Sequence, residues 1–193
     1  MGAMTRIGNK SAMGLGMAIV LAAAAASAYD LYASARQKFD LISSDRLLAG
    51  ARIELSSAEL NAYAQHEVPP GVRNPKLQLV ARGEATGSAM VDFGKVRRAQ
   101  GDQPGWLMSK LLDGERPVSV TVRIHSSAGT AKVDVLRVDV SGVEIDGKVL
   151  DFLIQNVLLP LYPNAMVGRT FDLSHRIDRL EVGPAGVSVV IGR

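Results

Sequence analysis

Residues 118–125 read VSVTVRIH, and this stretch decides the fold. Apolar and polar side chains alternate strictly along it, which is the pattern of a β-strand with one buried and one solvated face. A turn around Gly129 follows, and the alternation then resumes. It slips by one residue between Val135 and Val138 and slips again before Val143, and such slips mark bulges or bends. The sequence therefore predicts long, bent antiparallel strands.

A second hairpin precedes this pair. Residues 76–79 and 84–93 alternate with the same period, and Gly83 separates them. The apolar face of the second strand carries three small residues: Ala85, Gly87 and Ala89. Small residues there predict that another element packs closely against this strand. The polar, glycine-containing residues 94–105 that follow predict a loop.

The end of the chain predicts a third hairpin. Residues 171–177 alternate in a way that places His175 on the apolar face of a strand. The tripeptide 184–186 (PAG) then turns the chain into a last strand, residues 187–191.

Two helices stand out by their boundaries. After a short strand at 52–55, Ser56 and Glu59 have the spacing of a capping box, which predicts a helix start. Residues 147–159 predict a second helix, with Asp146 as its cap. That helix is apolar over most of its circumference, which is typical of a buried, membrane-bound or lipid-facing helix.

The N-terminal residues form an uncharged stretch between Lys10 and Asp30. Its length and its two preceding positive charges predict a transmembrane anchor or a signal peptide, the latter cleaved after Ala28. A buried alanine-rich core helix is the third interpretation. In the anchor and signal-peptide interpretations, the domain lies outside the cytoplasmic membrane, because the positively charged Arg6 and Lys10 remain on the cytoplasmic side.

The predicted organisation has three parts. Residues 1–29 form the anchor or signal peptide, residues 30–50 a juxtamembrane helix, and residues 51–193 one extracytoplasmic domain. The length of 193 residues and the 47% hydrophobic content suit a single α+β domain of this kind.

Composition excludes several classes of function. The chain has no cysteine, which rules out disulfides, thiolate metal sites and a cysteine nucleophile. The net charge is +3, and removing residues 1–28 with Arg6 and Lys10 leaves +1. No basic run is interleaved with aromatic residues, so nucleic acid is not an expected partner.

The sequence also lacks a catalytic signature. Its three histidines are far apart in sequence, and the nucleophile elbow of serine hydrolases is missing. We expect neither an enzyme nor a bound metal or cofactor, although His175 would be the first residue to test for catalysis.

Residues 106–108 are a candidate membrane contact. Trp106, Leu107 and Met108 follow a loop that carries basic residues, and an aromatic tip flanked by bases suits a membrane interface. The alternative is that Trp106 covers the core.

The motif LSSAELN at 55–61, the segment GVEIDG at 142–147 and the helix ending in LLP at 158–160 together resemble a known class. These features are similar to bacterial extracytoplasmic proteins of the YpmS-like and LmeA-like kinds. The resemblance implies an N-terminal membrane helix and a bent antiparallel sheet packed on an apolar helix. It also implies a half-barrel like that of tubular lipid-binding (TULIP) domains.

The sequence thus predicts a membrane-tethered or exported, non-catalytic lipid-binding domain of the bacterial cell envelope. The residues expected to line its cavity are Val120, Val122, Val149, Leu150, Leu153, Ile154 and Val157. The alternative is an envelope protein that docks a protein partner through a sheet edge or the apolar helix.

Overall fold

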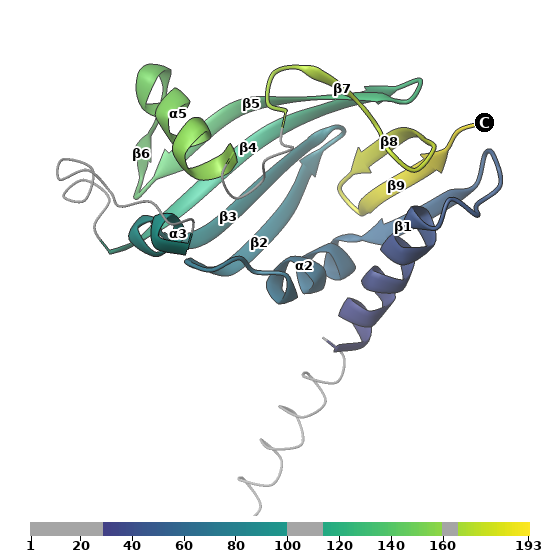
Figure 1. Ribbon diagram of the computed structural model, residues 1–193, viewed down its shortest axis with the longest axis horizontal. Coiled ribbons are helices and arrows are strands. Elements are labelled where there is room, and N and C mark those ends of the chain that lie inside the picture. Colours follow the sequence, from purple (N-terminus) through teal and green to yellow (C-terminus); the bar gives the residue numbers. More distant parts are fainter. Residues whose placement is uncertain (1–28, 100–113, 160–165) are drawn as a thin grey trace, which may run out of the picture.

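The computed structural model describes residues 29–99, 114–159 and 166–193 (Figure 1). Two antiparallel sheets and a few helices give an α+β fold, as the alternation of the sequence predicts. The larger sheet runs in the order β2-β3-β4-β5-β6, with β7 also paired to β5, and the smaller one in the order β1-β9-β8.

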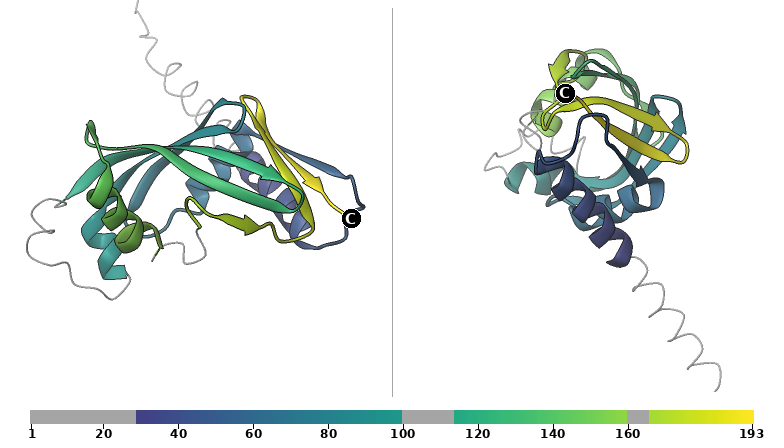
Figure 2. Two further views of the ribbon diagram at one scale, coloured as in Figure 1. Left: turned by 90° about the horizontal axis from the view of Figure 1, so that it is seen from above. Right: turned by 90° about the vertical axis from the view of Figure 1, so that its right-hand side faces the viewer.

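The long sheet contains the two predicted central hairpins and two shorter strands. Its strands are β2 (Val72–Ala81), β3 (Glu84–Asp92), β4 (Glu115–Ser127), β5 (Thr130–Val140), β6 (Val143–Glu144) and β7 (Thr170–Asp172). Seen from the end of the molecule, the sheet is strongly curved (Figure 2). The predicted bend is therefore present.

The first predicted slip is a bulge. Thr121 pairs with Arg137 but Val122 pairs with Val135, so Leu136 is the extra residue on β5. The second slip is a different feature. Ser141 and Gly142 have φ values of 57° and 83° and form a two-residue turn into β6, so a tight hairpin replaces the predicted bulge.

The small sheet contains the predicted terminal hairpin. It consists of β1 (Arg52–Ser56), β9 (Gly186–Ile191) and β8 (Ile177–Gly183). The preceding strand is shorter than predicted, because His175 and Arg176 adopt φ values of 56° and 55° and turn the chain. His175 is therefore exposed, 3.5 Å from the Asp45 carboxylate, and its predicted place on an apolar face was wrong.

The first described helix covers residues 29–43. It is shorter than the predicted helix, which ran to Gly50. Its Ala35 and Ile42 are buried against Leu55, Val189 and Ile191 of the small sheet. The helix therefore belongs to the core of the domain that was predicted to begin at residue 51. Within the described ranges, no helix combines the length and hydropathy needed to cross a membrane, and the predicted anchor lies almost wholly outside them.

Helix α2 (Ser57–His66) begins as predicted. The Ser56 hydroxyl accepts from the Glu59 backbone N–H at 3.2 Å, and the Glu59 carboxylate accepts from the Ser56 N–H at 2.8 Å. Helix α3 (Phe93–Ala99) replaces the start of the predicted loop. It forms because Phe93 and Val96, three residues apart, share one helix face and are both buried.

The predicted apolar helix consists of α5 (Gly147–Leu153) and a wider π-helical turn, η1 (Ile154–Leu158). Asp146 occupies the cap position, but its side chain makes no capping hydrogen bond, contrary to prediction. Figure 1 shows α5 and α3 at one end of the long sheet and the small sheet at the other.

Candidate functional site: an apolar trough between two cores

The two faces of the long sheet differ in polarity. Strand pairing aligns apolar side chains in rows across the sheet, Leu77–Gly87–Val120–Val138 and Leu79–Ala85–Val122–Val135. On the opposite face the corresponding row is polar, Gln78–Thr86–Thr121–Arg137. The apolar face therefore has to be covered by protein or by a ligand.

Two separate core clusters cover the ends of the molecule. The first lies between helix 29–43 and the small sheet and is centred on Leu55 and Val189. The second lies at the far end, where Val91, Phe93 and Val96 are buried together and Leu153 of α5 packs against them.

The centre of the apolar face belongs to neither core. We call this region the trough, and its residues are Leu77, Leu79, Gly87, Val120, Val122 and Val135. All six are half-buried, whereas the buried residues of the two cores are no more than 9% exposed; Ala85 and Val138, in the same apolar rows, are also buried, at 4% and 5% exposed.

Gly87 shows that the floor of the trough is open. A Cβ atom added at Gly87 would meet no atom of the described residues within 4 Å. The small residues of β3 had predicted that another element packs closely there. Ala85 is indeed 4% exposed and Ala89 packs against the second core, but among the described residues no such element is present at Gly87, where the interpretation fails.

The predicted lipid-binding residues divide into three groups. Val120 and Val122 lie in the trough. Leu150, Leu153 and Ile154 are half-buried at its far end, and Leu153 contributes to the second core. Val149 is 53% exposed, so it contributes to neither core.

The remaining predicted site residues cannot be placed. The side chain of Val157 and the predicted membrane contact of Trp106, Leu107 and Met108 lie outside the described residues. The sequence interpretation also missed Leu77, Leu79 and Gly87 as lining residues. Their alternation was visible, but only the register of β2 and β3 places them beside Val120 and Val122.

One wall of the trough is held by an asparagine. The Asn61 side chain on α2 donates to the Leu77 carbonyl at 2.8 Å and accepts from the Leu77 N–H at 2.7 Å. The amide therefore pairs with the edge of β2 as a neighbouring strand would, and it satisfies the backbone N–H and C=O groups of Leu77. It fixes the position of a trough residue relative to α2.

The near end of the trough is closed by the small sheet. The Gly83 N–H donates to the Val182 carbonyl at 3.0 Å. The Ser126 hydroxyl accepts from the Leu180 N–H at 2.8 Å and donates to the Leu180 carbonyl at 2.9 Å. These bonds tie β8 to the tips of the long sheet.

A buried carboxylate fixes the first helix to this end. Glu59 accepts hydrogen bonds from Lys38 Nζ and Ser34 Oγ, both at 2.6 Å, in addition to those from Ser56. Burial alone would raise the pKa of Glu59, but these donors outweigh it and lower the pKa to about 2. The carboxylate is therefore charged at neutral pH and joins helix 29–43 to α2.

Among the described residues, no group of three or more His, Asp or Glu side chains is arranged to hold a metal ion. Comparison of the chain with protein-family models, with curated proteins and with solved structures finds no match.

Proposed function

We propose that the protein is a non-catalytic lipid-binding domain whose trough holds an acyl chain. The observation that carries the proposal is the open, wholly apolar floor at Gly87, between two cores that are already filled. An apolar surface of this kind favours a ligand that removes it from water.

The length of the apolar face suits one acyl chain. Across its four strands, from β2 to β5, the trough extends for about 14 Å at the usual spacing of neighbouring strands. One leaflet of a membrane is about 15 Å deep, since the hydrocarbon core of a bilayer is about 30 Å thick. An acyl chain could therefore lie in the trough along nearly its whole length.

The apolar rows carry no charged side chain that could recognise a head group. Binding would depend on the hydrophobic effect, which contributes about 0.8 kcal/mol for each buried CH₂ group. Ten such groups contribute about 8 kcal/mol before the cost of association is subtracted.

The same proposal includes the location. Residues 1–29 would tether the domain to the cytoplasmic membrane or direct its export, and the trough would work in the cell envelope. The curved sheet with an apolar helix at one end would then be a half-barrel of the TULIP type.

Native mass spectrometry of the full chain, expressed in bacteria, tests the proposal. We expect bound masses that match phospholipids or fatty acids. Gly87→Phe should abolish them, because the ring fills the open floor of the trough. Ser88→Phe places the same ring on the polar face of the same strand and should leave them unchanged.

The paired variants also control for lipid bound by residues 1–29, which both variants retain. Equal retention of lipid by Gly87→Phe and the wild-type protein would reject the trough as the binding site. A wild-type protein free of lipid would reject tight lipid binding.

A further inference from the structure

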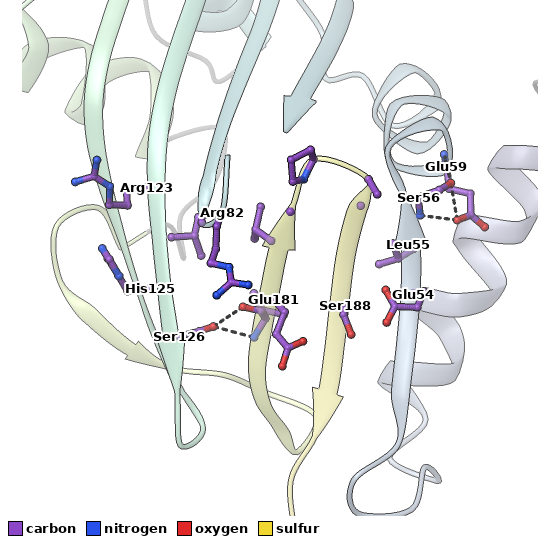
Figure 3. A pocket seen from close by; sticks show the side chains of 18 of the residues that line it. Glu54, Leu55, Ser56, Glu59, Arg82, Arg123, His125, Ser126, Glu181 and Ser188 are labelled. Atoms are coloured by element: carbon purple, nitrogen blue, oxygen red, sulfur yellow. Dashed lines mark hydrogen bonds between the residues drawn. The ribbon is translucent and has the colours of Figure 1, made fainter. Parts of the chain in front are cut away.

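A second concave site lies outside the trough and is polar. A cleft of about 1100 Å³ opens where the β8–β9 hairpin meets β1 and the tips of the long sheet (Figure 3). Its lining includes charged side chains from each of these elements, in contrast to the apolar rows of the trough.

One wall of the cleft is a row of polar side chains across the small sheet. The register aligns Glu54, Ser188 and Glu181 on neighbouring strands, so the row spans about 10 Å. Glu181 is already paired with Arg52 at 2.7 Å and Arg179 at 2.9 Å. The Glu54 carboxylate has no hydrogen-bond or ion-pair partner among the residues that the structure describes.

Ser188 lies in the middle of this row and is 6% exposed. Its hydroxyl is the one buried side-chain N or O atom of the described residues without a hydrogen-bond partner. Buried polar groups are nearly always paired, so an unpaired one calls for an explanation. A polar ligand in the cleft would supply the missing bond.

The opposite wall carries an unpaired cation. Arg82, in the turn between β2 and β3, makes no ion pair or hydrogen bond within the described ranges. Figure 3 shows its side chain directed towards the β8–β9 hairpin. The lysine and the other arginine of the lining are neutralised, Lys38 by Glu59 and Arg123 by Glu84, both at 2.6 Å.

These charges select the class of ligand. A simple anion drawn to Arg82 would also meet the unpaired carboxylate of Glu54, and a simple cation drawn to Glu54 would meet Arg82. A molecule that carries an ammonium group and an anionic group satisfies both walls.

We propose that this cleft binds a small zwitterion, with its ammonium group at Glu54 and Ser188 and its phosphate or carboxylate at Arg82. The proposal is independent of lipid binding in the trough. The zwitterion could be a free solute or the head group of a lipid, and the two share the same chemistry.

Isothermal titration calorimetry of the full chain with O-phosphoethanolamine tests this proposal. We expect saturable binding that is at least about tenfold tighter than binding of inorganic phosphate or of ethanolamine alone. Arg82→Gln and Glu54→Gln should each weaken binding about tenfold. Both side chains are exposed, so neither change should affect folding, which thermal denaturation checks. Arg46→Gln removes an exposed charge outside the cleft lining and should have no effect.

Two results would overturn the proposal. One is equal affinity for phosphate and O-phosphoethanolamine, which would make the cleft an anion site. The other is binding that is unchanged in both Arg82→Gln and Glu54→Gln. Gly87→Phe must leave O-phosphoethanolamine binding intact, which separates failure of this proposal from failure of the trough.

A second experiment distinguishes a free zwitterion from a lipid head group. If Arg82→Gln lowers the retention of phosphatidylethanolamine but not that of phosphatidylglycerol in native mass spectrometry, the ligand is a lipid head group. If Arg82→Gln changes neither, while binding of O-phosphoethanolamine still depends on Arg82, the ligand is a free zwitterion.

Discussion

Gly87 and Gly186 are both glycines in the strands of antiparallel sheets, yet their surroundings are opposite. A Cβ atom at Gly186 would collide with the carbonyl of Leu55, whereas one at Gly87 would meet nothing within 4 Å among the described residues. The two positions represent the two regions of the molecule. The small sheet is tightly packed under helix 29–43, and the centre of the long sheet has an open apolar face.

Two valines show the same difference between the small sheet and the centre of the long sheet. Val189 in the small sheet is 4% exposed, because Ala35 and Ile42 of the first helix pack against it. Val120 has the same alternating pattern in the long sheet but remains half-buried. Alternation in a sequence thus tells which side chains share a face, and the covering element decides whether that face becomes a core or a binding site.

The largest expected effect is at the covered glycine. Gly186→Ala should lower the free energy of unfolding by about 3 kcal/mol, because the new methyl group must displace the backbone of β1. Urea denaturation measures this change. A loss below about 1 kcal/mol would show that the small sheet yields easily and would weaken the contrast with Gly87.

The next largest effect is that of acid, which should lower the free energy of unfolding by protonating Glu59. The pKa of Glu59 is about 2 in the folded protein, below its ordinary value of 4.5, so its stabilising effect is complete above about pH 5. It is lost as the pH falls through 4.5 towards 2, and we expect a loss of about 3 kcal/mol over this range.

Urea denaturation between pH 6 and pH 2.5 tests this prediction. Glu59→Gln should be less stable than the wild-type protein at pH 6 and should lose less stability in acid. Glu115 and Glu181, whose pKa values are also lowered, titrate in both proteins, so the difference isolates Glu59. Parallel pH profiles for the two proteins would contradict the assignment.

The wall of the trough should show an intermediate effect. Asn61→Ala removes both hydrogen bonds to the Leu77 backbone and should cost about 2 kcal/mol of the free energy of unfolding. Gln65→Ala on the exposed side of the same helix is the control and should change stability by less than about 0.5 kcal/mol. Equal effects of the two changes would mean that Asn61 does not hold the edge of β2.

The smallest effect completes the comparison of glycines. Gly87→Ala should raise the free energy of unfolding by about 0.5 kcal/mol, because alanine restricts the unfolded chain and its methyl group enters open space. Thermal denaturation beside Gly186→Ala checks the sign. A destabilised Gly87→Ala protein would show that the trough is filled by the protein itself.

Local rules predicted much of the fold. The capping box of Ser56 and Glu59, the hairpin at Gly83 and the bulge at Leu136 each depend on neighbouring residues, and each is present. The sequence patterns failed where tertiary contacts determine the local secondary structure. Burial of Phe93 and Val96 forms a helix from residues that predicted a loop, and the backbone turn at His175 interrupts an apparent strand.

The candidate site was predicted only in part, for the same reason. Val120 and Val122 were identified from their alternation, but Leu77 and Gly87 join them only through the register of three strands. Val149 was included because its helix is apolar, and sequence alone did not show that this position faces solvent. The polar cleft lined by Glu54, Ser188 and Arg82 brings together residues from β1, β9 and the β2–β3 turn, which no local pattern connects.

The most direct test of the trough compares the two faces of one strand by methyl NMR. A fatty acid that carries a paramagnetic doxyl group should be added to the full chain with labelled valine and threonine methyl groups. We predict that the signals of Val120 and Val122 broaden much more than the signals of Thr86 and Thr121, which lie on the polar face and therefore farther from the doxyl group. Broadening that is equal on both faces, or absent from Val120 and Val122, would contradict the proposal that the trough holds an acyl chain.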